Sequence, residues 1–307
     1  MKMAPEWRDR LRHWTVTLAK DFYRPLGDIS FEGFQTYDHI SPQQALENSG
    51  YTPVPEGTPW GNEWEYMWLK GEIVLPPEAE GQMIVLNLNP GGETTLFVNG
   101  NSFGTYRAGW VTVPHHFMED NILTENGKAG ETYLLQAEAY AGHFYPESPL
   151  EGCCTGPVIP GTYTDPLEGK LRTKMGKNTF GIWNEDAYQL WMDVVTLTEV
   201  MTCLPESSLR AAKIGKALEK FTLAVDFEQP LEGRIADYKK GREILKEALS
   251  CVNGSTAPTF YGIGNAHLDV AWLWPLAETE RKVSRTFAAQ LRLVEKYPGY
   301  KLLERQP

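Results

Sequence analysis

The stretch YGIGNAHLDVAWLWP, residues 261–275, decides how the C-terminal part of this 307-residue chain folds. Residues 259–264 are apolar or β-prone and contain glycines, which predicts a short buried strand. Residues two apart in an extended segment point to the same side, so His267 and Asp269 can present an imidazole and a carboxylate together at the end of this strand. One nitrogen and one oxygen ligand suit Zn²⁺ or a similar divalent cation, and two further ligands must come from elsewhere.

An H-x-D triplet alone is a weak signal, because it is more often a hydrogen-bonded histidine or a solvated loop acid. The next residues give it a context. Pro275 predicts the start of a helix, since it fixes φ where no backbone donor is needed, and residues 300–307 begin as a second strand would. The apolar face predicted for this helix consists of Leu276, Val283, Phe287, Leu291 and Val294. A strand, a helix and a strand open a parallel α/β barrel, which carries catalytic groups at the C-terminal ends of its strands.

The middle of the chain, residues 25–183, has the texture of strands and turns. Short apolar or alternating runs broken by Gly, Pro and Asn predict a β-sandwich. Its clearest signal is Asn99-Gly100 after strand-like residues, which predicts a type I′ hairpin turn. Four aromatic residues are candidates for a platform on which a sugar could stack: Trp64, Trp68, Tyr106 and Trp110. Large aromatics at alternating strand positions more often fill the interior of a sandwich, so both roles stay open.

Helical periodicity lies on both sides of the sandwich. Apolar residues spaced by three and four predict one amphipathic helix near the N-terminus and three connector helices before the barrel segment. The predicted organisation is an N-terminal helix (1–24), the β-sandwich (25–183), the helical connector (184–257) and the start of an α/β barrel (258–307). Because a single β–α unit supplies no full set of sheet neighbours, residues 259–307 are expected to be the least protected part.

Composition and charge exclude several classes of protein. The formal net charge is -11 and Lys and Arg form no dense tract, so no nucleic-acid partner is expected. No apolar run approaches the ~20 residues of a membrane span, and the first residues lack a secretory signal, which predicts a cytoplasmic protein without a membrane partner. The four cysteines, Cys153, Cys154, Cys203 and Cys251, form no C-x-x-C pair and are predicted to be reduced thiols.

Residues 264–279 closely resemble the opening motif of the glycoside hydrolase family 38 enzymes, the retaining α-mannosidases, in the branch with cytosolic and bacterial members. The family pattern G-H-x-H-I-D-x-A-W-L-W-P-x-x-E-T aligns with them without a gap. The hairpin segment 98–104 also resembles the V-N-G-x-x-x-G hairpin of the galactose-binding-like jelly roll. Together these resemblances imply a jelly-roll sandwich and a helical connector that precede a barrel of the (β/α)7 type.

The resemblance implies roles for individual residues of the motif. His267 and Asp269 would be zinc ligands, with Co²⁺ or Mn²⁺ as other cations that such a site accepts. Trp272 would line the sugar pocket, and Trp274 would pack beneath the loop. Asn265 stands where the family usually has a His, which would change the hydrogen bonds around the metal ligands.

The function implied by the resemblance is metal-dependent hydrolysis of terminal α-mannosides of oligosaccharides, with retention of configuration. The nucleophile, the acid/base and the remaining metal ligands are expected beyond Pro307, so residues 1–307 alone are expected to be inactive. The alternative from another class is a non-catalytic, carbohydrate-binding β-sandwich with a vestigial barrel remnant. The sequence does not decide whether the protein forms a homo-oligomer.

Overall fold

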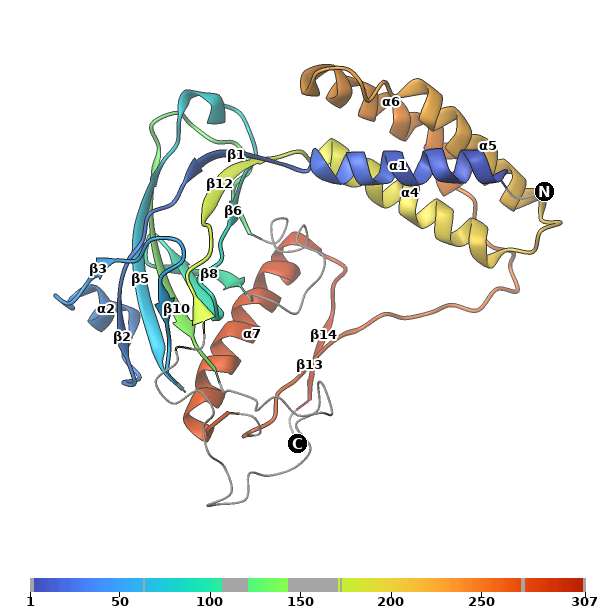
Figure 1. Ribbon diagram of the computed structural model, residues 1–307. Coiled ribbons are helices and arrows are strands. Elements are labelled where there is room, and N and C mark those ends of the chain that lie inside the picture. The colour runs from blue at the N-terminus through green and yellow to red at the C-terminus, as the bar shows by residue number, and fades with distance from the viewer. Residues whose placement is uncertain are drawn as a thin grey trace. The chain divides into compact units, whose positions relative to one another are not determined.

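A computed structural model describes residues 3–62, 64–106, 121–142, 171, 173–271 and 274–305. The chain divides into two units, each of which combines segments that are distant in sequence (Figure 1). The helical unit comprises Met1–Arg24 and Ile182–Phe260, and the sandwich unit comprises Pro25–Gly181 and Tyr261–Pro307. The N-terminal helix therefore groups with the connector helices, and the barrel segment groups with the sandwich.

The helices expected from apolar periodicity are present in the helical unit. They are α1 (Pro5–Lys20), α4 (Glu185–Cys203), α5 (Leu209–Ala224) and α6 (Leu231–Leu249). The side chain of Asn184 begins α4 by accepting a hydrogen bond from the backbone N–H of Ala187, and Ser208 begins α5 in the same way. Their apolar stripes are buried, including Leu18, Leu190, Val194, Leu218 and Phe221. The predicted period of 3.6 residues is confirmed for each helix.

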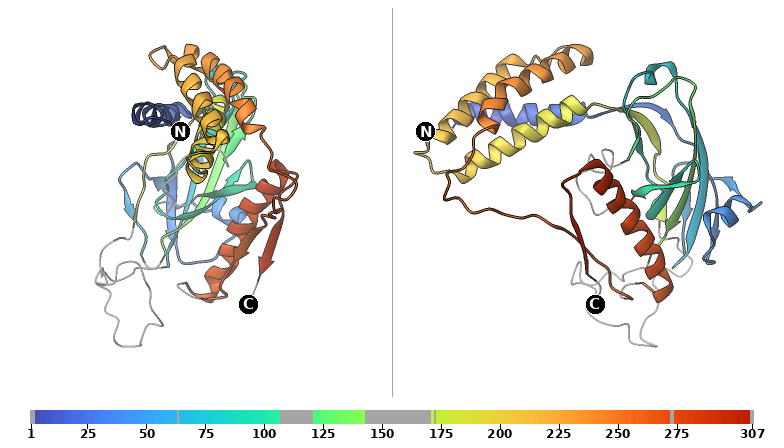
Figure 2. Two further views of the ribbon diagram at one scale, coloured as in Figure 1. Left: turned by 90° about the vertical axis from the view of Figure 1, so that its right-hand side faces the viewer. Right: turned by 180° about the vertical axis from the view of Figure 1, so that it is seen from behind.

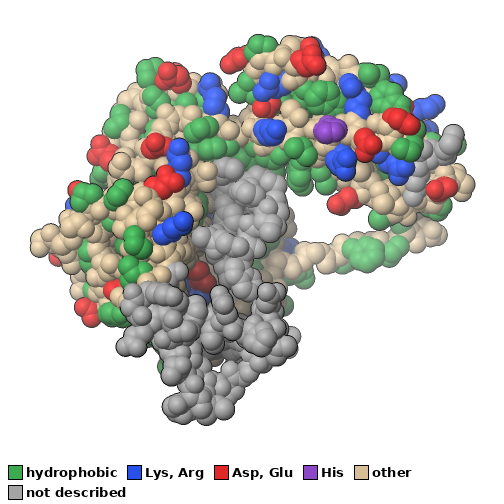
Figure 3. All heavy atoms as spheres, viewed as in Figure 1, with side chains coloured by type: hydrophobic (Ala, Val, Ile, Leu, Met, Phe, Trp, Pro, Cys, Tyr) green, Lys and Arg blue, Asp and Glu red, His purple; other side chains and the backbone are tan. Residues whose placement is uncertain are grey.

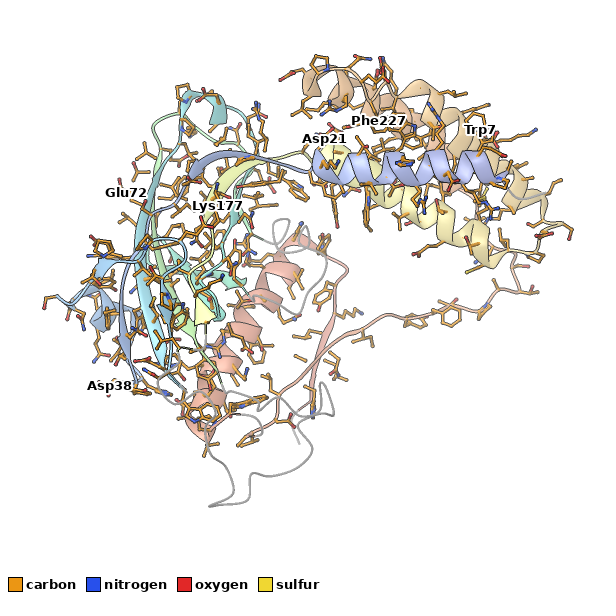
Figure 4. All side chains as sticks on the ribbon, in the orientation of Figure 1. Trp7, Asp21, Asp38, Glu72, Lys177 and Phe227 are labelled. Atoms are coloured by element: carbon orange, nitrogen blue, oxygen red, sulfur yellow. The ribbon has the colours of Figure 1, made fainter. Side chains whose placement is uncertain are left out.

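Polar and aromatic contacts attach α1 to this unit. Two nitrogens of the Arg234 guanidinium bind the two carboxylate oxygens of Asp21, at 2.7 and 2.8 Å. Trp14 stacks on Phe227 with ring centroids 3.7 Å apart, and Figure 4 labels Phe227 and Asp21 among the side chains of this unit. The N-terminal helix is thus an integral part of the helical unit.

The sandwich unit contains two main sheets, and the six-stranded one is antiparallel throughout. The four-stranded sheet has the order β1 (Tyr23–Asp28), β12 (Thr179–Trp183), β6 (Ile84–Asn87), β9 (Ile122–Thr124). The six-stranded sheet has the order β3 (Thr52–Pro53), β2 (Glu32–Thr36), β5 (Tyr66–Val74), β10 (Thr132–Tyr140), β7 (Glu93–Val98), β8 (Asn101–Tyr106). Smaller elements are the strand pair β4 (Pro59–Trp60) and β11 (Thr173–Lys174), the helix α2 (Pro42–Leu46) and a 3₁₀ turn at Pro77–Ala79. The predicted β-sandwich is confirmed.

The register of the six-stranded sheet separates its two faces. Leu69 of β5 lies opposite Ala137 of β10, which lies opposite Leu96 of β7, and all three are fully buried on the inner face. On the other face, called the outer face below, Trp68 of β5 lies opposite Glu138 of β10. The outer face also carries Tyr66, Tyr140 and Glu93 in register. Because these side chains are polar or aromatic yet largely buried, something must cover them.

The hairpin between β7 and β8 forms where the sequence predicts it. Asn99 has a φ of 50° and Gly100 a φ of 78°, the left-handed values of a type I′ turn. The Asn99 side chain also accepts a hydrogen bond from the backbone N–H of Leu134, at 2.9 Å. This bond ties the turn to strand β10.

Charged side chains of both signs lie on the surface. Figure 3 shows acidic and basic side chains interspersed over the described residues of one face. No described helix has both the length and the apolar composition of a membrane span.

Replacement of Gly100 by Ala should lower the free energy of unfolding by about 1 kcal/mol, because an L-residue is strained at a left-handed φ although the space around Gly100 is open. Urea denaturation followed by tryptophan fluorescence measures the change. Gly254→Ala is the matched control, since Gly254 also borders open space but has no left-handed φ. Equal stability of the two variants would contradict the assignment of the turn.

Candidate metal site

The segment that the sequence singled out forms a strand, a helix and a strand. Strand β13 (Gly264–His267) pairs in parallel with β14 (Leu302–Arg305), and helix α7 (Leu276–Lys296) lies between them in the chain. The predicted β–α–β order is confirmed, whereas closure into a barrel stays a prediction. The predicted start of the first strand is wrong: residues 259–263 are exposed and outside β13, because only residues opposite β14 find backbone partners.

His267 and Asp269 lie together at the C-terminal end of β13. The Nε2 atom of His267 is 3.4 Å from Oδ1 of Asp269, and the two side chains are 58% and 40% exposed. One imidazole nitrogen and one carboxylate oxygen are therefore adjacent and open to solvent, which fits two of the four positions of a tetrahedral zinc site. Within the described ranges, no third His, Cys, Asp or Glu joins them in a cluster that could hold a metal ion.

Two further residues of the motif were expected beside this pair. Asn265 is exposed and lies two residues before His267 in β13, so both side chains project from the same face of the strand while Ala266 is buried on the other. Trp272, expected to line a sugar pocket, lies outside the described residues.

The segment between β13 and α7 is attached to the first turns of the helix. Thr279 donates a hydrogen bond to the carbonyl oxygen of Val270 and accepts one from Nε1 of Trp274, the latter at 3.2 Å. The ammonium group of Lys282 lies 4.4 Å from the centroid of the Trp274 ring, within the range of a cation–π contact. Trp274 is half-buried beneath these contacts.

Helix α7 covers the outer face of the six-stranded sheet, along β8 and β7 (Figures 1 and 2). The contact is made largely by charged groups, called the ion cluster below: Glu93 and Glu138 from the sheet, and Glu278, Arg281, Lys282 and Arg285 from α7. The carboxylate of Glu278 is fully buried, pairs with Arg285 and accepts a hydrogen bond from the Tyr66 hydroxyl. Its burial is possible because a cation and a donor both reach it.

The remaining members of the ion cluster pair across the interface. Lys282 Nζ lies 2.7 Å from Glu93 Oε2, and Arg285 Nη2 lies 3.6 Å from the same oxygen. Arg281 Nε lies 3.4 Å from Glu138 Oε1. Burial raises the pKa of Glu138 and lowers the pKa of Arg285, and the opposite charges around each group counteract these shifts. Three acids face three bases, so the cluster is neutral overall.

The apolar face assigned to α7 from the sequence is largely open. Val283 is partly buried, whereas Leu276, Phe287, Leu291 and Val294 are 36 to 63% exposed. The charged residues at positions 278, 281, 282 and 285 face the sheet instead. The sequence contains a pattern that indicates this charged face, because charges spaced by three, four and seven residues form a continuous stripe on one side of a helix.

The aromatic residues considered for a sugar platform lie elsewhere. Tyr106 is 5% exposed and its hydroxyl donates to the carbonyl oxygen of Leu86 in the opposite sheet, so it fills the interior. Trp68 is 1% exposed, on the outer face beside Phe97. Trp64 is partly buried, and Trp110 lies outside the described residues. Trp68 and Tyr106 therefore offer no open stacking surface.

Comparison with protein families finds two matching segments. A family described as "Alpha-mannosidase, jelly roll domain" matches residues 25–146. A second family, described as "Glycosyl hydrolases family 38 N-terminal domain", matches residues 257–307, which include β13, the His267–Asp269 pair and α7.

Curated relatives agree with these matches. An "Alpha-mannosidase" of Saccharomyces cerevisiae is 52% identical over 267 residues, which covers 81% of this chain and 22% of the relative. "Alpha-mannosidase 2C1" of Mus musculus is 23% identical over 305 residues, which covers 93% of this chain and 27% of the relative. The chain thus spans about a quarter of the length of these relatives. Among solved structures, a β-glucuronidase of Ruminococcus gnavus aligns with 52% of this chain and 29% of that chain, at 14% identity and a TM-score of 0.33, too low to carry an argument.

Removal of one member of the buried ion pair should destabilise the sandwich unit strongly. Arg285→Met leaves the buried carboxylate of Glu278 without its cation and should lower the free energy of unfolding by about 3 to 5 kcal/mol. Urea denaturation measures the effect. The double variant Glu278→Met/Arg285→Met should recover most of the loss, because two apolar side chains leave no unpaired charge. Lys246→Met, which breaks an exposed pair with Glu243, is the control; a loss no larger than in this control would contradict the burial of Glu278.

Zinc should bind weakly to the 307-residue chain. With His267 and Asp269 as its protein ligands, half of a tetrahedral shell is left to water, so we expect a dissociation constant above about 1 µM. Isothermal titration calorimetry of the chain and of His267→Ala tests this. A nanomolar site that is lost in His267→Ala would show that further ligands complete the shell.

Proposed function

The chain belongs with the α-mannosidases of glycoside hydrolase family 38, and from this premise we propose that it is part of a metal-dependent enzyme that hydrolyses terminal α-mannosides of oligosaccharides. The observation that carries the proposal is the His267–Asp269 pair. It lies at the C-terminal end of a parallel strand, inside the segment that matches the family 38 domain. Strand ends of this kind carry the catalytic groups of α/β barrels.

In the proposed site His267 and Asp269 bind a divalent cation. The preferred cation is Zn²⁺, and Co²⁺ and Mn²⁺ are the alternatives. When bound, the metal supplies a positive charge that orients sugar hydroxyls and stabilises negative charge. The exposure of both side chains leaves the pair accessible to a sugar from solvent. Asn265, on the same face of β13, is the neighbour that can hydrogen-bond to ligands of this site.

The proposed reaction retains the configuration at the anomeric carbon. It needs a carboxylate nucleophile and a second carboxyl group that acts first as acid and then as base, about 5 to 5.5 Å apart. Asp269 is assigned to the metal and is therefore not proposed as nucleophile or acid/base. Glu278 is not proposed for these roles either, because its carboxylate is fully buried between Tyr66 and Arg285. The proposal places both catalytic carboxyl groups outside residues 1–307, in line with the length of the relatives.

The substrate proposed from the names of the relatives is an oligosaccharide with terminal α-mannose. The proposed location is the cytoplasm, without a nucleic-acid or membrane partner, as expected from charge and composition. Trp272 is proposed to contact the sugar. A non-catalytic, carbohydrate-binding sandwich has less support, because Trp68 and Tyr106 are buried and cannot stack on a sugar.

An enzyme extended through the whole barrel should hydrolyse an aryl α-mannoside when Zn²⁺ or Co²⁺ is added, and NMR of the first product should show the α-anomer. Asp269→Ala should reduce this activity by at least about 100-fold, since even residues that only support metal ligands cost 10- to 100-fold. Asp28→Ala, at an exposed aspartate that pairs with Lys177, should leave the activity unchanged. The 307-residue chain should show no turnover.

Full activity of the extended Asp269→Ala enzyme would refute the assignment of Asp269. Metal-dependent turnover by the 307-residue chain would refute the placement of the catalytic carboxyl groups, provided that Asp269→Ala abolishes it and so excludes a contaminating mannosidase.

A further inference from the structure

The segment between β13 and α7 is fixed beside a candidate metal ligand. Val270 follows Asp269 directly, and its carbonyl oxygen accepts the hydrogen bond of the Thr279 hydroxyl. The same hydroxyl accepts from the indole N–H of Trp274, so one threonine joins both ends of the segment. Trp274 and the backbone next to Asp269 are therefore connected through one hydroxyl group.

Lys282 connects this segment to the sandwich. Its ammonium group has the Trp274 ring on one side, 4.4 Å from the centroid, and the Glu93 carboxylate on the other, 2.7 Å away. The Lys282 side chain is 12% exposed and that of Glu93 is 29% exposed, so solvent screens the charge-assisted hydrogen bond only partly. Glu93 belongs to strand β7, a rigid element of the six-stranded sheet.

The position of Lys282 is itself determined by the ion cluster. Lys282 lies four residues after Glu278, on the same side of α7. The Glu278 carboxylate pairs with Arg285 of the same helix and accepts a hydrogen bond from Tyr66 of β5. If α7 slid along the sheet, this buried carboxylate would keep its cation but lose the Tyr66 donor. Leu276, Phe287, Leu291 and Val294 of α7 are exposed, so these four apolar side chains contribute little to this register.

We propose that Lys282 is a positioning residue through which the jelly-roll sandwich fixes the segment that carries Asp269. Glu93 fixes the ammonium group, the ammonium group fixes the Trp274 ring, and Trp274 with Thr279 fixes the carbonyl of Val270. This chain of contacts, called the relay below, joins Glu93 of strand β7 through Lys282, Trp274 and Thr279 to Val270, the residue after the candidate metal ligand. The sandwich thereby acts on the site through the contact of Glu93 with Lys282.

The consequence for metal binding rests on the proposed function. A metal or sugar site tolerates displacements of about 0.5 Å in its ligands, so Asp269 must be held relative to His267. His267 is part of β13, whereas Asp269 lies beyond the strand, where backbone pairing with β14 has ended. Asp269 is the ligand whose position depends on the relay.

The test measures the mobility of the segment in the 307-residue chain, without metal. A nitroxide label is attached through Ala271→Cys, an exposed position in the segment, after the four native cysteines are replaced by serine. We expect Lys282→Met and Glu93→Gln each to shorten the rotational correlation time of the label by about threefold, as a fixed segment becomes a free loop. Lys282→Arg should restore the wild-type value, because a guanidinium group can pair with the carboxylate and stack on the ring.

Lys70→Met is the matched control. Lys70 lies 3.3 Å from Glu32 and 4.2 Å from the Tyr51 ring centroid, so it makes the same two kinds of contact, here with two partners on the sandwich. The proposal is overturned if the label is unaffected in both Lys282→Met and Glu93→Gln, or if Lys70→Met has the same effect. It is also overturned if the increase in mobility accompanies loss of amide protection in β5 and β10, since the role of Lys282 would then be only structural.

Because the label reports on the segment and not on catalysis, this result does not depend on whether the enzyme hydrolyses mannosides. The mobility of the label tests the role of Lys282, and the mannosidase assay tests the proposed function, so the two proposals can fail separately.

Discussion

The burial of the Glu278 carboxylate is the constraint on which the arrangement of the sandwich unit depends. A charge without solvent must be compensated by a cation and by hydrogen-bond donors. Arg285 supplies the cation from the same helix, and Tyr66 supplies the donor from strand β5. Because Tyr66 points to the outer face of the sheet, the carboxylate is compensated in full when α7 lies on that face at one register. The helix and the sheet are thus a single structural unit.

This constraint explains why α7 presents its charged stripe to the sheet. Apolar contacts are non-directional, so a helix docked by them can shift by a fraction of a turn at little cost. Ion pairs and hydrogen bonds have defined distances and angles, and a shift breaks them. The exposed apolar residues Phe287 and Leu291 remain available on the opposite side of the helix. The expectation that residues 259–307 are the least protected part stays a prediction, and the ion pairs between α7 and the sandwich are the contacts that oppose it.

The features that depend on local residues could be predicted from the sequence. Asn99-Gly100 defines its turn through two φ angles, the helices of the helical unit follow from apolar spacing, and His267 and Asp269 meet because they are two residues apart. The face by which α7 docks could not be predicted in this way. Periodicity reveals an apolar and a charged stripe, but the choice between them depends on Tyr66, which is 212 residues distant from Glu278 in the chain. The start of β13 was misplaced for a related reason, because its length is set by pairing with β14.

The family pattern aligned with residues 264–279 ends in Glu278 and Thr279, and the structure gives each of these residues a contact. Glu278 attaches α7 to the sheet, and Thr279 attaches the helix to the segment that follows Asp269. The pattern contains the His267–Asp269 pair proposed to bind a metal, and it ends with two residues proposed to hold this pair relative to the sandwich. A metal site whose ligands lie partly beyond a strand needs such support, because backbone pairing alone does not fix them. The motif therefore describes a ligand pair together with its attachment, which is why it extends a full helical turn past the chemistry.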